Sequence, residues 1–471
     1  MAPGFVFYDI VFLILSTLGV ILFLYKRRNN LQRQGLLYLY RTKVGIKFIE
    51  WAASKFRRTL NVMQYVVVVC GYVLMISMIY MLIKFSYFYL TSPIAAEALK
   101  VPVIVPLVPY LPEIFNLDFL PPFYFTYWII IIAIIAIPHE FAHGIFARLH
   151  KIKIHSTGFG FLGPFLAAFV EPDDKEMEKK SKFAQLAVLA SGTFANIIFA
   201  LLLGLLFWLF FAFAFTPAGV IFNSYATKVV QIDQIGYIDD NVVSNIDEMP
   251  NLINESTKYT KIRVDGENLF VSSQGLLTAL DNDAVRVSAA MDSPAFRAEL
   301  SGAIKSIDGV EIKSFDDLRT ELGKQQPGEE IKIVTIQDKD EIKEYDVELA
   351  EFDGEAFLGI GVINPQTKGI VGLIYKLIMK IKDPFVYYTS ALGDLGIFVY
   401  NLLWWGILIS LSVALVNMLP LGMFDGGKFF YLSIWGLTGK VKAGEMAFKI
   451  STYAILALIA LLMVRWLFIF V

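Results

Sequence analysis

The stretch IIIIAIIAIPHEFAHGIFARLH, residues 129–150, begins as a run of lipid-soluble side chains and then carries His139, Glu140 and His143. An apolar run of this kind is typical of a helix that crosses a membrane. On a helix, residues four apart lie on one face about a turn from each other, so both imidazoles can face one metal ion with Glu140 beside them. Ionisable groups are costly inside a bilayer and usually functional there. The stretch therefore predicts a spanning helix with an H-E-x-x-H metal site, a zinc protease signature.

The whole chain has the composition of a membrane protein. Of its 471 residues, 56% are hydrophobic and 15% aromatic, and the mean hydropathy is +0.59. These values exceed those of ordinary soluble domains. About 20 apolar residues are needed to cross a bilayer as a helix. Six runs meet this requirement, at about 5–25, 61–84, 123–147, 183–214, 396–420 and 448–470. We expect the first to be a retained span, because it has neither a basic leader nor a small-residue cleavage site.

Charge predicts how these spans are oriented. Residues 26–59 contain ten Lys and Arg against one acid, Glu50. Such a segment belongs on the cytoplasmic side by the positive-inside rule. Alternation from there predicts that both termini and residues 215–395 lie outside. The single cysteine, Cys70, excludes an intramolecular disulfide and a thiolate metal site.

A soluble domain is predicted between the fourth and fifth spans. Residues 218–365 contain 28 Asp and Glu against 13 Lys and Arg, a net charge of −15, and no run of spanning length. Alternating apolar and polar residues predict strands at VRVSA (285–289), AIKSID (303–308) and EIKIVTI (330–336). Between them, SFDDLRTEL (314–322) predicts a short helix capped by its serine. We therefore expect an extramembrane α+β domain.

Three other segments are predicted to lie at or near the membrane. Residues 151–174 are punctuated by glycines and by Pro164, which indicates a hairpin or re-entrant loop on the cytoplasmic side. Non-helical backbone at membrane depth needs a protein or water-filled interior beside it. Residues 90–121 are rich in proline and predict an irregular outer loop. Residues 369–388 place lysines among aliphatic residues, as an interfacial amphipathic helix does, although they can also begin a longer fifth span.

A catalytic zinc site needs a third protein ligand besides the two imidazoles. His150 and His155 lie beyond the span, and we expect them at the surface. A better candidate is Asp425, in NMLPLGMFDGG (417–427) at the end of the fifth span. The third and fifth spans both run inward, so their ends meet at one level of the membrane. The alternative role of Asp425 is to cap the helix that follows it, and capping does not exclude ligation.

This combination of motifs resembles the site-2 protease family of intramembrane zinc metalloproteases. HEFAH in one span, NMLPLGMFDGG in a later span and a PDZ-like domain between them carry the resemblance, over residues 123–430. The fourth span also resembles the family's G-x-x-x-N pattern through Gly192 and Asn196. In place of the usual Leu-Asp-Gly, the chain has Phe424-Asp425-Gly426. The first two spans lie outside the family's common core.

The resemblance implies a cofactor, site residues and partners. It implies Zn²⁺ held by His139, His143 and Asp425, with Glu140 as general base. It also implies Asn417 near the substrate backbone, and we expect Asn196 to help hold that backbone. The implied partners are membrane-protein substrates with a transmembrane helix and the lipid bilayer, and no nucleic acid. The active site is expected toward the cytoplasmic side, with the PDZ-like domain outside.

The sequence thus predicts a polytopic α-helical membrane protein of about six transmembrane helices with an inserted PDZ-like domain. A small second unit is expected within this domain, around residues 225–285, because the region is longer than one PDZ module. The predicted parts are an N-terminal two-span region (1–121), the first half of the catalytic core (122–217), the PDZ-like domain (218–365), the interfacial helix (366–395), and the second half of the core with the last span (396–471).

Two other functions fit parts of the pattern. A metal transporter or receptor can use His139, His143 and Asp425 to bind an ion without proteolysis. A substrate-recruiting scaffold with a degenerate site is a further possibility, but the intact H-E-x-x-H and Asp-Gly motifs argue against it. Glu140 discriminates between the first alternative and a protease. A transporter tolerates Gln at this position, whereas a protease loses turnover and keeps its metal.

Overall fold

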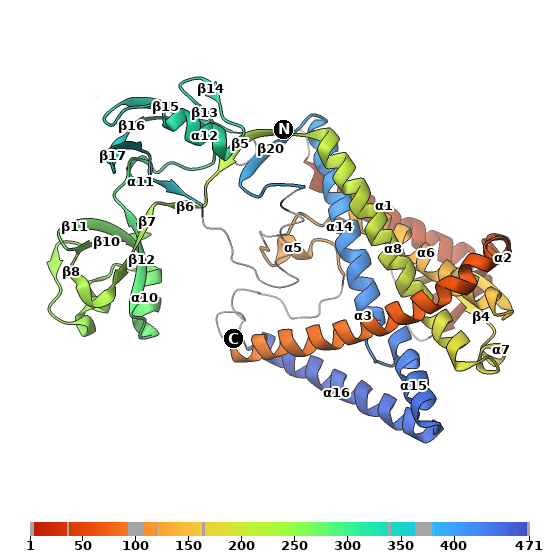
Figure 1. The fold of residues 1–471 in the computed structure, drawn as a ribbon. Coiled ribbons are helices and arrows are strands. Elements are labelled where there is room, and N and C mark those ends of the chain that lie inside the picture. The colour runs from red at the N-terminus through yellow and green to blue at the C-terminus, as the bar shows by residue number, and fades with distance from the viewer. Residues whose placement is uncertain are drawn as a thin grey trace. The chain divides into compact units, whose positions relative to one another are not determined.

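The chain folds into two compact units (Figure 1). The computed structural model describes residues 4–34, 37–92, 107–117, 120–162, 165–337, 341–362, 379 and 381–468. The first unit is formed by Met1–Phe210 with Ile397–Val471, and the second by Phe211–Gly396. The second unit is therefore inserted in the sequence of the first.

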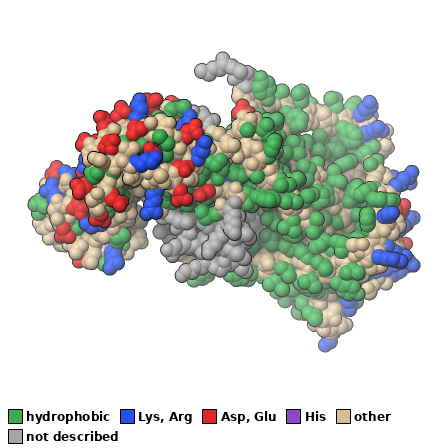
Figure 2. All heavy atoms as spheres, turned by 45° about the horizontal axis from the view of Figure 1, so that its top comes forward, with side chains coloured by type: hydrophobic (Ala, Val, Ile, Leu, Met, Phe, Trp, Pro, Cys, Tyr) green, Lys and Arg blue, Asp and Glu red, His purple; other side chains and the backbone are tan. Residues whose placement is uncertain are grey.

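Six helices among the described residues are long and apolar enough to cross a membrane, which agrees with the six predicted runs. They are α1 (Phe5–Lys26), α3 (Arg57–Thr91), α6 (Phe125–Leu149), α8 (Lys182–Ala214), α14 (Gly393–Asn417) and α16 (Val441–Leu467). Hydrophobic side chains cover most of the face of this unit in Figure 2, and Lys and Arg gather at one end. Such a surface is stable in contact with lipid rather than water.

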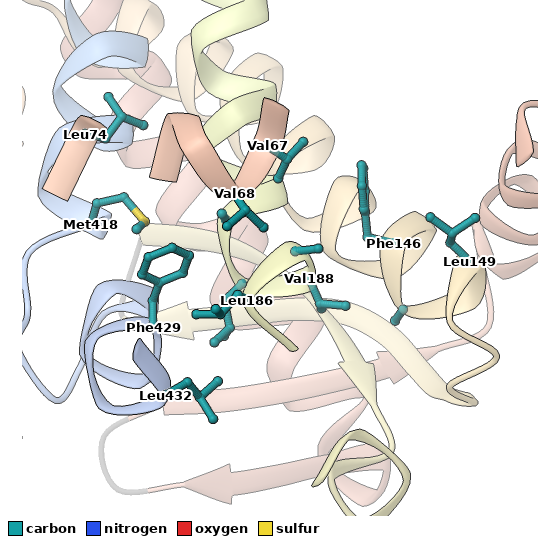
Figure 3. Packing of buried hydrophobic residues seen from close by; sticks show 14 of the residues in the cluster. Val67, Val68, Leu74, Phe146, Leu149, Leu186, Val188, Met418, Phe429 and Leu432 are labelled. Carbon is teal, nitrogen blue, oxygen red and sulfur yellow. The ribbon is translucent and has the colours of Figure 1, made fainter. Parts of the chain in front are cut away.

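The centre of the first unit is an apolar core that joins five helices, since Ala414 of α14 also belongs to it (Figure 3). Val67 of α3, Phe146 of α6, Val188 of α8 and Phe429 of α15 (Asp425–Thr438) belong to one buried cluster. Because the helices that carry the predicted site residues share this core, their relative positions are fixed by close packing.

A four-stranded sheet lies next to this helical core. Its order is β1-β2-β3-β4, and every neighbouring pair is antiparallel. The strands are β1 (Leu31–Gln34), β2 (Leu37–Thr42), β3 (Ile154–Leu162) and β4 (Phe165–Pro172), and α2 (Ile46–Lys55) follows β2. Strands β3 and β4 confirm the predicted hairpin. The basic segment 26–59 is more than a connecting loop, because it contains β1, β2 and α2.

Helix α6 begins at a buried carboxylate from another helix. Asp9 of α1 is 2% exposed, and it is the one buried residue of that helix. Its oxygens accept hydrogen bonds from the backbone N–H groups of Phe125 and Thr126 at 2.8 and 2.9 Å. The hydroxyls of Tyr110 and Thr126 donate to it as well. Asp9 therefore caps α6, since a helix N-terminus leaves such N–H groups without partners and carries partial positive charge.

The second unit contains two larger sheets. The first has the order β16-β15-β13-β5-β20, with β14 beside β13, and the second has the order β7-β12-β11-β10-β8-β9. The elements of the first are β5 (Phe215–Ile221), β13 (Ala303–Ile307), β14 (Val310–Glu311), α12 (Phe315–Leu322), β15 (Glu330–Ile336), β16 (Ile342–Glu348) and β20 (Val386–Ser390). Those of the second are β7 (Thr227–Gln231), β8 (Ile235–Ile238), β9 (Asn241–Val242), β10 (Tyr259–Val264), β11 (Glu267–Ser272), α10 (Ser273–Asp281) and β12 (Arg286–Met291).

The elements predicted in this unit are confirmed. Strands β12, β13 and β15 lie at the predicted alternating stretches, and α12 follows Ser314, whose side chain accepts a hydrogen bond from the N–H of Asp317. Each larger sheet has its own buried apolar cluster. The second sheet occupies residues 227–291, where the length of the region led us to expect a second small unit.

The prediction of an interfacial helix over residues 366–395 is wrong at residues 386–390. Residues 386–390 form β20, which pairs with β5 from Val386↔Val220 to Ser390↔Phe215. Helix α14 begins only at Gly393, so these residues do not extend the fifth span either. Val386 is buried and the other four residues of this strand are partly exposed, which suits its place at the end of the sheet order. Residues 363–378 and 380 lie outside the described residues.

Candidate metal centre and active site

His139 and His143 lie one turn apart in the second half of α6 and face each other. Their Nε2 atoms are 3.1 Å apart, and their rings meet nearly edge to face, with an interplanar angle of 77°. His139 is 6% exposed. Two imidazole nitrogens directed at one point inside a helical bundle form the first half of a metal site.

Asp425 completes a three-ligand cluster from a different part of the chain. Its Oδ2 lies 3.3 Å from Nε2 of His143 and 3.6 Å from Nε2 of His139. Tetrahedral zinc with bonds of about 2.0–2.1 Å places its ligand atoms about 3.3 Å apart. The three separations match this spacing, and among the described residues no other group of His, Cys, Asp or Glu offers such a cluster. The donor set therefore fits a zinc ion.

A tight turn after α14 brings Asp425 to the histidines. Asp425 is the first residue of α15, and the N-cap position is held by Phe424 without a side-chain cap. The capping alternative for Asp425 is therefore wrong. A Cβ at Gly426 would lie 2.3 Å from the carbonyl carbon of Met418, so only glycine permits α15 to pack against the end of α14. The Asp-Gly pair thus combines a ligand with the close approach that positions it.

Hydrogen bonds fix the orientation of both imidazoles. Nδ1 of His143 lies 2.8 Å from the carbonyl oxygen of Val188 and donates to it, which leaves Nε2 free as a ligand. The side-chain amide of Asn196 lies 3.0 Å from Nδ1 of His139. Its Nδ2 faces the ring and its buried Oδ1 has no partner. If Nε2 of His139 binds a metal, the proton of the ring lies on Nδ1. The Asn196 amide, turned by 180°, would then accept a hydrogen bond from this Nδ1–H through its Oδ1.

Asn196 therefore faces His139 rather than an open substrate channel, which differs from the expected substrate contact. Its side chain is completely buried, and Ser410 of α14 donates to its backbone carbonyl at 2.8 Å. The reason is helical periodicity, because residues 192 and 196 lie on the face of α8 that packs against α6. Asn417, at the end of α14, is partly buried, and its Nδ2 lies 3.5 Å from Nε2 of His139. It thus borders the ligand cluster.

Glycine at position 192 makes room for the ligands. A Cβ there would lie 2.3 Å from Nε2 of His143 and 2.7 Å from Nε2 of His139. The backbone of α8 thus forms one wall of the metal site. The sequence pattern G-x-x-x-N is explained by this packing, with Gly192 against both rings and Asn196 one turn further along.

Glu140, the expected general base, lies on the wall of a cavity beside the ligand cluster. It lines the same cavity as His143 and Asp425. Its Oε2 accepts a hydrogen bond of 3.1 Å from the backbone N–H of Val170, on β4. The carboxylate is thereby held by the sheet as well as by its own helix, with one oxygen left over.

A cavity of about 380 Å³ leads from the ligands to polar side chains. His143, Glu140 and Asp425 line its inner part, together with Val188 of α8. Its remaining wall includes the charged residues Asp174 and Glu178 of α7 (Asp174–Glu178) and Lys428 of α15. These three side chains are exposed, so water has a polar route to the site.

Comparison with known proteins agrees with the motifs. Residues 127–462 match the model of Peptidase family M50, which is more than two thirds of the chain. The chain belongs to this family. It is an integral membrane protein with six candidate membrane spans among its described residues and a cluster of two histidines and one aspartate that could hold a metal ion.

Three curated proteins are similar to part of this chain. Zinc metalloprotease RasP of Shouchella clausii is 27% identical over 203 residues, which cover 37% of this chain and 48% of that protein. Zinc metalloprotease RasP of Bacillus licheniformis is 24% identical over 190 residues, covering 35% of this chain and 45% of that protein. The uncharacterized protein MJ0971 of Methanocaldococcus jannaschii is 29% identical over 195 residues, 40% of this chain and 48% of that protein. The chain spans about half the length of these relatives.

One solved structure matches a small part of the chain. The PDZ domain of the SdrC-like protein from Listeria monocytogenes is 25% identical over 15% of this chain and 78% of that structure, with a TM-score of 0.14.

Two site features of this M50 chain were missed in the sequence. Strand β2 lies before the region that matches the family, and its Arg41 binds Glu171 of β4 through two hydrogen bonds, of 2.9 and 2.8 Å. The alternation in LYLYRT (37–42) is a strand signal that could have revealed it. The carbonyl of Val188, which orients His143, has no signal in the sequence, because any residue type supplies a carbonyl.

The two remaining histidines lie outside the metal cluster. His155 is exposed on β3 and lies 3.0 Å from Asp173, so its predicted surface position is confirmed. His150 is the C-cap residue of α6 and is only partly exposed. Its buried Nε2 has no partner among the described residues. Burial and the nearby Lys180 lower the pKa of His150, which favours its neutral form.

Proposed function

We propose that this chain is an intramembrane zinc metalloprotease that hydrolyses peptide bonds within or near transmembrane segments of membrane proteins. The observation that carries the proposal is the convergence of His139, His143 and Asp425, with Glu140 in the same cavity. Transport or storage of an ion requires ligands but no carboxylate poised beside them. Hydrolysis requires both the metal ligands and a carboxylate beside them.

We assign the metal to the Nε2 atoms of the two histidines and to Oδ2 of Asp425. Zinc bound there supplies a Lewis acid that polarises the scissile carbonyl and acidifies water. Glu140 takes a proton from the attacking water and passes it to the leaving amine. The N–H of Val170 binds one oxygen of Glu140, so the other oxygen is free to exchange the proton. Asn417, beside the cluster, is placed to donate a hydrogen bond to the substrate backbone.

Strand β4 offers an edge for an extended substrate. It is the last strand of its sheet, and the N–H of Val170 points away from β3 toward Glu140. Backbone groups alternate in direction along a strand, so those of Ala168 and Leu166 point to the same edge, which has no strand partner among the described residues. A substrate helix unwound near its cleavage site can pair with this edge, which brings its amides toward Glu140. The charge of residues 26–59 supports a cytoplasmic position for this end of the site.

The role of the second unit follows from its place in the chain. We infer that it is an extracytoplasmic PDZ-like domain that selects substrates, by binding extended chains or by limiting their size. Its acidic residues support exposure to water.

The test is turnover by the purified full-length protein in lipid vesicles. Wild type and Glu140→Gln are compared on a panel of single-span substrates, with bound zinc measured in the same samples. We expect cleavage by wild type alone, with about one zinc in each protein, because the variant keeps all three ligands. Glu248→Gln, at an exposed residue of the second unit, is the matched control and should cleave normally. Equal cleavage by wild type and Glu140→Gln would refute the protease. Zinc uptake into vesicles by wild type that is unchanged in Glu140→Gln would also refute it and would favour a transporter.

A further inference from the structure

The N-terminal segment that precedes the family match builds part of the active-site sheet. Strands β1 and β2 form half of the four-stranded sheet, and β2 pairs with β3 from Tyr38↔Phe161 to Thr42↔Thr157. The family match begins only at residue 127. Strand β4, which touches Glu140, is thus held in a sheet that the matched region alone does not complete.

On one face of this sheet, an ionic contact spans three strands. Arg41 of β2 donates from Nε and Nη2 to the two carboxylate oxygens of Glu171 on β4, at 2.9 and 2.8 Å. Ser156 of β3 donates to the same carboxylate at 2.5 Å. Gly158 is the residue of β3 that pairs with Arg41, and a Cβ there would lie 2.5 Å from the ring of Phe169. The two hydrogen bonds from the Arg41 guanidinium to the Glu171 carboxylate fix the direction of this contact as well as its distance. It also holds the pKa of the Glu171 carboxyl below its ordinary value.

On the opposite face, apolar packing holds the neighbouring residue of β4. Successive residues of a strand point to opposite faces, so Val170 points away from the ionic contact. Val170 packs in a buried cluster with Ile154 of β3 and Ile49 of α2, and Ile49 is completely buried. The space beside Gly144 of α6 is filled by Ile49 and Val170 together, since a Cβ there would lie 2.9 and 3.2 Å from them. The N-terminal segment therefore contacts β4 on both faces of the sheet, through Arg41 on one face and Ile49 on the other.

Val170, which these contacts hold in place, is the residue that binds Glu140. The N–H of Val170 donates to Oε2 of Glu140, and Val170 lies directly before Glu171. A change in the position of β4 is therefore transmitted to the carboxylate through one hydrogen bond. We propose that Arg41 is a positioning residue for the reaction, which through Glu171 and β4 holds Glu140 against its substrate. This proposal rests on the proposed protease function.

The first test compares Arg41→Gln with wild type in vesicles, with a single-span substrate at several concentrations. We expect kcat to fall about tenfold, because small misplacements of catalytic groups are costly, while KM changes less than twofold. Bound zinc should stay at the wild-type level, because no ligand contacts Arg41. Arg41→Lys should lie between the two, since lysine keeps the charge and loses the fork. Lys47→Gln, at an exposed residue of α2, should behave as wild type.

Charge reversal separates positioning from a general loss of structure. The double variant Arg41→Glu with Glu171→Arg should recover at least half of the kcat that Arg41→Glu alone loses. Hydrogen exchange of the peptide covering residues 165–172 should be faster in Arg41→Gln than in wild type, and normal in the double variant. This exchange is measured on the protein without substrate, so it remains informative if no substrate is cleaved. A normal kcat in Arg41→Gln, a loss of zinc together with activity, or unchanged exchange over 165–172 would overturn the proposal.

Discussion

Gly192 and His143 are in such close contact that any side chain at position 192 would collide with the imidazole. A Cβ built on Gly192 would lie 2.3 Å from Nε2, the atom assigned to the metal. The backbone of α8 thus takes part in shaping a site whose ligands all come from other helices. The metal site depends on helix packing as strictly as on the identity of its ligands.

Gly192→Ala should lower zinc affinity by at least about a hundredfold, because the methyl group displaces a ligand nitrogen. Zinc content after dialysis against a buffered zinc series measures this directly. Gly204→Ala is the matched control on the same helix, since a Cβ at Gly204 meets nothing within 4 Å. Normal zinc binding in Gly192→Ala would contradict the geometry described for α8 and α6.

Asn196→Ala should weaken zinc binding by about tenfold or more, because His139 loses the partner that fixes its ring and its tautomer. Asn196→Asp should restore binding, since a carboxylate accepts from Nδ1–H as an amide oxygen does. The measurement is zinc affinity of the full-length protein by competition with a chelating dye. If alanine and aspartate variants bind zinc equally well, Asn196 does not orient His139.

Asp9→Ala should destabilise the protein by about 2 kcal/mol, because the first N–H groups of α6 and two hydroxyls lose their acceptor. Thermal unfolding in detergent micelles, followed by circular dichroism, should show a lower melting temperature. Asp9→Asn keeps an acceptor oxygen and should fall between alanine and wild type. Tyr8→Phe, at an exposed neighbour in α1, should leave the melting temperature unchanged.

The contact between Arg41 and Glu171 should make stability depend on pH in the acid range. The folded pKa of Glu171 lies below its ordinary value of 4.5, chiefly because of the hydrogen bonds from Arg41. Its contribution is therefore complete above pH 4.5 and is lost as the pH falls through the lowered pKa. The difference in melting temperature between wild type and Glu171→Gln should be constant from neutral pH to about pH 5 and shrink below that. In an Arg41→Gln background, the effect of Glu171→Gln on the melting temperature should be small at every pH. A melting-temperature difference between wild type and Glu171→Gln that grows on acidification would contradict this assignment.

The sequence by itself determined the features that local rules encode. The six apolar runs predicted the spans, and the four-residue spacing of His139 and His143 predicted that both face one ion, because helix geometry fixes that relationship. The alternation in EIKIVTI and the serine before FDDLRTEL predicted β15 and α12 in the same way. The strand at 386–390 was missed because its partner, β5, lies far away in the chain.

Only the tertiary structure decided how distant segments meet. The approach of Asp425 to the two histidines depends on the turn after α14 and on Gly426, and the roles of Val188 and Asn196 depend on the packing of α8 against α6. The sheet that links Arg41 to Glu171 and, through Val170, to Glu140 joins segments separated by whole helices. Such contacts are set by which faces the packed helices and strands present to each other, and that choice depends on residues far apart in the chain.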